Sequence, residues 1–153
     1  MKHSKYVCKT EDSFWVFKFK SEGSKGLVQK IVLYTETGSE NVYNLGFGDY
    51  DPETGSMNDI SVTNNGDSAK ILATVAATVY TFTEIHPAAW IMASGSTAAR
   101  TRLYRMGITN NLSVISEHFA IFGYNCQGNW EYFVVGKTYE AFMITRKEND
   151  DTL

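Results

Sequence analysis

Apolar and polar residues alternate along the first third of the chain, a pattern that predicts β-strands. In residues 13–20 (SFWVFKFK), Trp15, Phe17 and Phe19 fall on one face and the two lysines on the other. Three further strands are predicted at residues 27–36, 42–47 and 59–62. Short turns separate the first three strands, so we expect them to pair in an antiparallel arrangement.

A helical pattern begins after the fourth predicted strand. From residue 69 to about residue 86, apolar residues recur every three or four positions, which predicts an amphipathic helix of about five turns that ends at Pro87. A short apolar strand is predicted at residues 89–93. A second helix follows and runs to about Met106, with Gly107 as its C-terminal cap.

The remaining elements complete an α+β pattern. Strands are predicted at residues 118–123, 130–135 and 141–146, residues 110–117 leave room for one helical turn, and residues 148–153 form a polar tail. The two strands of the strand–helix–strand–helix unit at 59–106 are expected to be parallel. The sequence therefore predicts a single α+β domain over residues 1–147. Its mixed, mostly antiparallel sheet has about seven strands, and its two main helices give the order ββββαβαββ.

Composition narrows the class of protein. The 153 residues are 43% hydrophobic and include nine Tyr, nine Phe and three Trp but two Pro, so the chain has enough apolar side chains to form a core and is not disordered. No stretch reaches the roughly 20 uncharged apolar residues that a membrane span requires. The formal net charge of −3 argues against the broad basic face that nucleic-acid binding needs.

The N-terminal residues and the cysteines indicate the compartment. Residues 1–12 contain no apolar signal core, and the two cysteines, Cys8 and Cys126, form no CxxC motif. We therefore expect a cytoplasmic protein with reduced thiols, and we interpret both cysteines as buried or incidental rather than nucleophilic.

Two loops precede the two predicted helices, at residues 63–68 and 94–97. Loops that leave the carboxyl ends of neighbouring parallel strands lie at the same edge of a sheet. Free backbone N–H groups and the helix dipole favour an anion at a helix N-terminus. We therefore expect an anion-binding cleft at this edge. Its candidate ligand-binding residues are Asn65, Gly66, Asp67, Ser68, Lys70, Ser96, Thr97 and Arg100.

Helix periodicity separates the arginines of the second helix. At about 100° per residue, Arg100 and Tyr104 share one flank, and Arg102 and Arg105 share the other. A charge-assisted bond from Arg100 to a phosphate or carboxylate is worth about 1.5–3 kcal/mol, whereas an exposed helix dipole contributes about 0.3–1 kcal/mol. Arg100 is therefore the main candidate for holding an anion. The alternative is that Thr97 is only a helix cap and Arg100 only a solvated side chain.

A metal site or a catalytic triad is not indicated. The acidic residues of the 48–58 stretch and its surroundings are Asp49, Asp51, Glu53 and Asp59. Compared with a calcium-binding loop, Gly55 comes one position late and Ile60 stands where the closing carboxylate belongs, so we interpret this stretch as a solvated acidic loop. One of its carboxylates remains eligible as a general base. The three histidines show no ligand spacing, and no G-x-S-x-G motif is present.

Three motifs resemble those of an uncharacterised bacterial family. They are NLGFGD (residues 44–49), TNNGDSAKILATV (residues 63–75) and GSTAARTRLY (residues 95–104). The resemblance covers most of the chain and implies a family of unknown activity.

The order of elements also resembles, more remotely, the GNAT N-acetyltransferase superfamily. That resemblance implies a pyrophosphate-binding loop at residues 63–68 and acyl-CoA, for example acetyl-CoA, in the gap between two splayed strands. It also implies that Tyr104 acts as the general acid that protonates the departing CoA thiolate.

Several classes of function remain open. The first is an acyl-CoA-dependent N-acyltransferase, and the second is a non-catalytic module that binds a small anionic ligand or a protein partner. Asp67 places a negative charge beside the expected pyrophosphate, a repulsion of about 4 kcal/mol at ~4 Å and an effective dielectric near 20, which favours the module. A toxin or regulatory partner of a small protein is a third possibility, and unpaired sheet edges leave a homodimer open.

Overall fold

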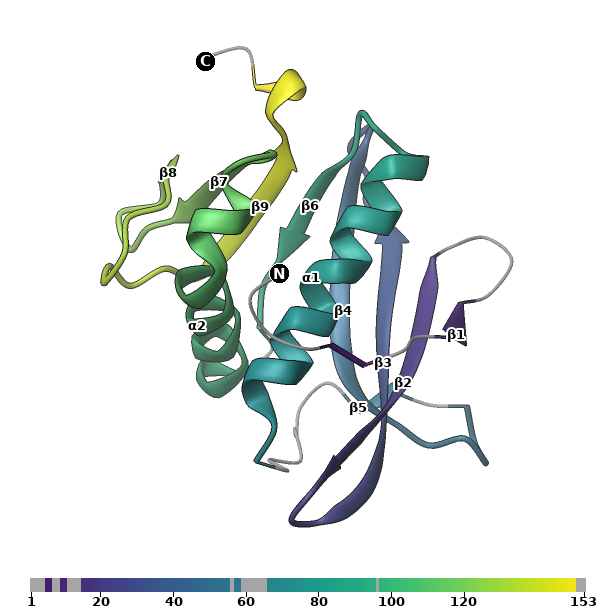
Figure 1. Cartoon of the computed structure of the whole chain (residues 1–153). Coiled ribbons are helices and arrows are strands. Elements are labelled where there is room, and N and C mark those ends of the chain that lie inside the picture. Colours follow the sequence, from purple (N-terminus) through teal and green to yellow (C-terminus); the bar gives the residue numbers. More distant parts are fainter. Residues whose placement is uncertain are drawn as a thin grey trace.

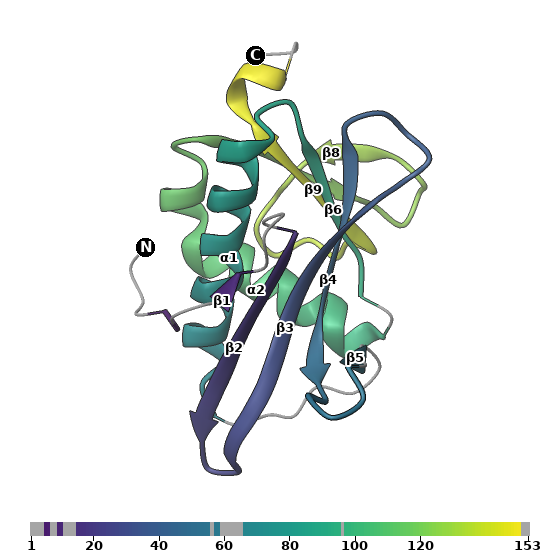
Figure 2. The same ribbon diagram turned by 90° about the vertical axis from the view of Figure 1, so that its right-hand side faces the viewer.

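A single mixed β-sheet forms the frame of the structure, and two helices lie together on one of its faces (Figures 1 and 2). The computed structural model describes residues 5–6, 9–10, 15–55, 57–58, 66–95 and 97–150. The nine strands of the described sheet follow the order β1-β2-β3-β4-β6-β9-β7-β8, and β5 pairs with β4. Because β1 and β5 have two residues each, the seven longer strands make up most of the sheet, and the predicted α+β class is confirmed.

The bounds of the elements are as follows. The strands are β1 (Lys9–Thr10), β2 (Val16–Gly23), β3 (Gly26–Glu36), β4 (Val42–Tyr50), β5 (Met57–Asn58), β6 (Trp90–Ala93), β7 (Phe119–Tyr124), β8 (Trp130–Tyr132) and β9 (Ala141–Arg146). The helices are α1 (Ser68–Ile85) and α2 (Ala98–Ile115), and a 3-10 turn, η1 (Lys147–Asn149), follows β9.

Strands β2, β3 and β4 form an antiparallel meander, as the alternating pattern predicts. The register places Phe17 opposite Val32, and Val32 opposite Phe47. All three side chains are buried in the core beneath the helices. Strand β4 is longer than the predicted third strand, because it continues to Tyr50 and takes in Asp49, which the sequence pattern assigns to a solvated loop.

Strand β4 also supplies the parallel neighbour of β6. Its first residues pair with β6, from Val42 opposite Trp90 to Asn44 opposite Met92. The sequence favoured residues 59–62 for this place, but these lie outside the described residues, and β6 has β4 on one side and β9 on the other. Among the described strands, β4 takes this place because its nine residues are enough to pair with β3 along one edge and with β6 along part of the other.

The two helices begin at the same end of the sheet, where β4 and β6 finish (Figure 1). Helix α1 matches the helix predicted over 69–86. Helix α2 is longer than predicted: it passes through Gly107 and ends at Ile115, so it includes the helical turn expected after residue 110. Gly107 is not a cap, because its lack of a side chain lets α2 approach α1; a Cβ there would lie 2.8 Å from Cδ2 of Leu72.

The first residues of the predicted tail are packed onto the domain. The amide of Asn149 donates hydrogen bonds to the carbonyl of Pro87 (2.7 Å) and to the hydroxyl of Thr145 (3.0 Å). The hydroxyl of Tyr132 donates a hydrogen bond to the carboxylate of Asp150 (2.8 Å). Asn149 and Asp150 are therefore held by the turn before β6 and by β8 and β9, and residues 151–153 lie outside the described part of the chain.

Candidate functional site

A polar pocket opens where β4 and β6 stop pairing. Beyond Asn44 and Met92 the two parallel strands form no further pairs, and the far end of β4 pairs with β5 instead. A pocket of about 220 Å³ lies at this divergence. The described residues that line it are Asn44, Leu45, Gly46, Phe47, Ser94, Gly95, Arg100 and Tyr104. We call it the polar pocket.

The first turn of α2 forms one wall of the polar pocket. Thr97 is the N-cap residue, and its hydroxyl oxygen accepts a hydrogen bond from the backbone N–H of Arg100 (3.2 Å). Gly95 passes so close to this turn that a Cβ would lie 2.3 Å from the backbone nitrogen of Thr101. Only glycine therefore fits at this position. The structure thus supports the capping role that the sequence left open for Thr97.

The side chain of Arg100 is buried against β4. Its residue is 2% exposed, and its guanidinium carbon lies 5.5 Å from the centre of the Phe47 ring. Neither Nε nor Nη2 has a hydrogen-bond partner within the described structure. The alternative interpretation of Arg100 as a solvated side chain is therefore wrong. The interaction with the ring offsets part of the desolvation of the charge but leaves these N–H groups unsatisfied.

Tyr104 lies one helical turn beyond Arg100 and lines the same pocket, as the flank assignment predicted. It is 6% exposed. The opposite flank of α2 faces a second pocket of about 360 Å³, whose described lining includes Thr97, Arg102 and Arg105. The two flanks of this helix therefore serve different pockets, and Arg102 does not contribute to the polar pocket.

The N-terminus of α1 is occupied by interactions within the chain. Asp67 is its N-cap residue, but the carboxylate makes no capping hydrogen bond. Instead, Oδ2 of Asp67 accepts hydrogen bonds from the hydroxyl of Tyr6 and from the hydroxyl of Ser21 (2.5 Å) on β2. Burial and the hydrogen bond to Asp67 raise the pKa of the Tyr6 hydroxyl above its ordinary value. The Asp67 charge is thus directed toward β2.

The other candidates near α1 do not line the polar pocket either. The ammonium group of Lys70 lies 4.2 Å from the centre of the Tyr6 ring. Ser68 is half-buried, and Gly66 is exposed with a φ of +77°. Asn65 and Ser96 lie outside the described residues. Of the eight candidate ligand-binding residues, the structure therefore brings Arg100 to the polar pocket, together with the candidate general acid Tyr104.

Comparison with known protein families identifies the family of this chain. A model described as "Family of unknown function (DUF6934)" matches residues 2–147. The chain belongs to this family. No curated protein and no solved structure matched the chain. The expected membership of a family of unknown activity is confirmed, whereas the resemblance to GNAT N-acetyltransferases remains a prediction.

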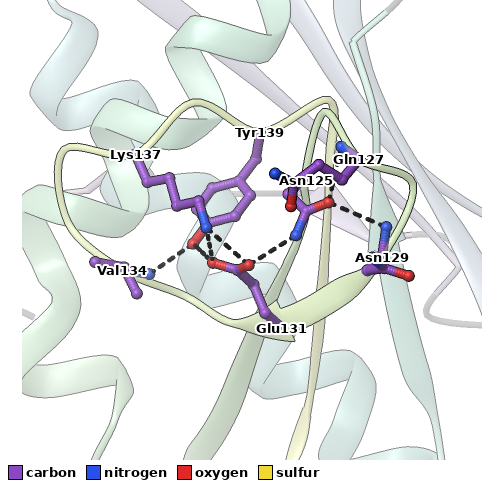
Figure 3. Close-up of polar contacts among 7 residues, drawn as sticks. All are labelled: Asn125, Gln127, Asn129, Glu131, Val134, Lys137 and Tyr139. Carbon is purple, nitrogen blue, oxygen red and sulfur yellow. Dashed lines mark hydrogen bonds and ion pairs between the residues drawn. The ribbon is translucent and has the colours of Figure 1, made fainter.

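A second polar cluster in this family member surrounds Glu131 on β8 (Figure 3). The carboxylate accepts hydrogen bonds from the ammonium of Lys137 (2.7 and 2.8 Å), the amide of Asn125 (2.7 Å) and the hydroxyl of Tyr139 (2.8 Å). These donors, Lys137 foremost, lower the pKa of Glu131 to about 2. The carboxylate is thus held by its own chain, so we interpret this cluster as a clamp between β8 and the loops before and after it.

The sequence carries a signal for the β4 wall of the polar pocket, which the predicted site at the helix N-termini does not include. The motif NLGFGD at residues 44–49 carries the family resemblance, and its first four residues line the pocket.

Within the described residues, no three His, Cys, Asp or Glu side chains gather as a metal site requires. Neither described helix is long and apolar enough to serve as a membrane span.

Proposed function

We propose that the protein binds a small oxyanion in the polar pocket, with Arg100 as its receptor. The observation that carries this proposal is that the buried guanidinium leaves Nε and Nη2 without hydrogen-bond partners in the described structure while it lines a pocket of about 220 Å³. No acidic side chain is present among the described lining residues to neutralise it.

The free-energy cost of burying the Arg100 charge without a partner favours a bound ligand. Burial of an unpaired charge disfavours folding by several kcal/mol, and a folded protein that retains such a group gains from a partner of opposite charge. The planar guanidinium matches a carboxylate or a phosphate because it can donate two parallel hydrogen bonds to either. A bound oxyanion would therefore satisfy donors that the described chain leaves unpaired.

The proposal is tested by ligand-induced stabilisation. Sodium acetate and sodium phosphate are compared with sodium chloride at equal ionic strength, and thermal unfolding is followed for the wild type, Arg100→Gln and Arg102→Gln. An oxyanion at ten times its dissociation constant adds about 1.4 kcal/mol to the unfolding free energy, or about 3–6 °C in Tm.

The two variants make the test specific. We expect the gain in the wild type and in Arg102→Gln, whose side chain lies on the other flank of α2, but not in Arg100→Gln. An equal gain in Arg100→Gln would refute the proposal, and so would the absence of any gain in the wild type.

A second candidate is an acyl-CoA-dependent N-acyltransferase. The divergence of the parallel strands β4 and β6 supports it, since acyl-CoA would lie in such a gap. In this function Tyr104 is the general acid, and the backbone amides from Asn65 to residue 69 hold the pyrophosphate. The carboxylate of Asp67 at the N-terminus of α1 weighs against a second anion there.

Titration calorimetry with acetyl-CoA separates the two candidates. Heat at millimolar acetyl-CoA, together with acetyl transfer to amines that falls about 100-fold in Tyr104→Phe, would support the enzyme. Binding of small oxyanions without heat from acetyl-CoA supports the binding module.

A further inference from the structure

An apolar slot adjoins the polar pocket between the two helices. Its volume is about 60 Å³, and its described lining comes from α1, α2 and the helix-covered face of the sheet. The lining includes Leu45 on β4, Ala76 on α1 and Tyr104 on α2. Leu45 and Tyr104 line both spaces, so these two residues form the junction between the slot and the polar pocket.

We infer that the ligand is a monocarboxylate with a short aliphatic tail, whose carboxylate is held by Arg100 and whose tail enters the apolar slot. This inference rests on the proposed function. It adds the substrate class, because a ligand that fills both spaces must be charged at one end and apolar at the other.

The charge of the lining favours a monoanion. Within the described lining of the polar pocket, Arg100 alone carries a full charge. The nearby ammonium of Lys30 is paired with Asp49. One guanidinium balances one carboxylate, whereas a phosphate dianion would bring a second negative charge without a matching cation.

The size of the slot sets the length of the tail. A slot of about 60 Å³ has room for a short tail of roughly two methylene-sized groups. With the carboxylate and the adjoining carbon in the polar pocket, the two remaining carbons of butyrate would fill the slot. Each buried methylene is expected to tighten binding about fourfold. Affinity should therefore rise from acetate through propionate to butyrate and rise no further at hexanoate.

The position of Ala76 and Ala77 on α1 provides a matched pair of variants. Both side chains are half-buried, but Ala76 lines the slot and Ala77 does not. Leucine at position 76 would occupy the space of the tail, and leucine at position 77 serves as the control for a larger side chain in the same helical turn. Both substitutions retain a good helix former.

The experiment is a chain-length series measured by calorimetry on the full chain. In the wild type and in Ala77→Leu, butyrate should bind about 16-fold more tightly than acetate, since it carries two further methylenes. In Ala76→Leu, acetate should bind as in the wild type, and butyrate no more tightly than acetate. Butylammonium, which has the tail without the negative charge, should not bind.

The outcomes separate this inference from the proposed function. If acetate binds in an Arg100-dependent way but butyrate binds no more tightly, the inference is overturned and the proposed function stands. If no carboxylate of any length binds the wild type, the proposed function fails and the inference with it. Tighter binding of butyryl-CoA than of butyrate would assign the slot to an acyl thioester and overturn the free carboxylate. The wild-type series decides the matter even if Ala76→Leu does not fold.

Discussion

The ammonium of Lys30 lies 2.5 Å from the carboxylate of Asp49, directly across the pairing of β3 with β4. The Lys30 side chain has no exposed surface, whereas that of Asp49 is 21% exposed. Asp49 therefore neutralises a lysine that the sheet buries, and this accounts for the carboxylate better than the solvated loop that the sequence indicated.

The loss of Asp49 is predicted to be more harmful than the loss of Lys30. Asp49→Asn leaves a buried ammonium without its counter-charge, which we expect to lower the unfolding free energy by about 3–5 kcal/mol. Lys30→Met leaves the Asp49 carboxylate, which water reaches, and should lower the unfolding free energy by less. Urea unfolding of both single variants and of the double variant measures the coupling. Equal costs for the two single variants would contradict this assignment.

Replacement of the anion receptor is predicted to stabilise the protein. Arg100→Met removes an unpaired buried charge and keeps much of the side-chain volume, so we expect the unfolding free energy to rise by about 1–3 kcal/mol. That gain corresponds to an increase in Tm of about 2–4 °C per kcal/mol. The exposed Arg102, changed to Met, should alter stability by less than about 0.5 kcal/mol. A fall in Tm for Arg100→Met would indicate that the guanidinium stabilises the fold without a ligand.

The clamp around Glu131 predicts a pH dependence. The folded-state pKa of about 2 lies below the ordinary value of 4.5, so the carboxylate stabilises the fold above pH 4.5 and this contribution is lost as the pH falls toward 2. The Tm difference between the wild type and Glu131→Gln should therefore be constant above about pH 5 and shrink below it. Glu140→Gln, at an exposed carboxylate, is the control. A difference that persists unchanged at pH 2 would exclude this account.

The contact between Gly123 and Tyr139 predicts a steric effect. A Cβ at Gly123 would lie 2.4 Å from Cδ1 of Tyr139. The ring cannot move away cheaply, because its hydroxyl donates to Glu131 and accepts from the backbone N–H of Val134. We expect Gly123→Ala to cost about 1–3 kcal/mol. Gly38→Ala, which meets no atom within 4 Å, should be nearly neutral in the same urea titration.

Local sequence patterns predict where each helix and strand lies along the chain better than they predict which elements pack beside one another. The spacing of apolar residues from 69 to 86 gave α1 to within one residue at each end. The local pattern predicts a helix cap at Gly107. The actual role of this glycine is to make room for Leu72, which lies on another helix and is distant in the sequence. Which strand lies beside β6 likewise depends on how far β4 extends along the sheet, and the alternation within one strand does not contain that information.

Local patterns likewise predict only the part of the candidate site that lies within one helix. Helix geometry alone placed Arg100 and Tyr104 on one flank, and both line the polar pocket. The burial of Arg100 is set by Phe47 on the sheet, so no local pattern distinguishes it from the exposed Arg102 two residues later. The direction of the Asp67 carboxylate depends in turn on Tyr6 and Ser21, which lie far away in the chain.

The place of β9 in the sheet has a consequence for biosynthesis. Residues 141–146 lie between β6 and β7, although both of those strands leave the ribosome earlier. The meander of β2, β3 and β4 is complete in the nascent chain while the partner edges of β6 and β7 are still bare. The two halves of the sheet can join only after Arg146 has left the exit tunnel, so the protein gains its cooperative stability after all the other strands of the sheet have emerged.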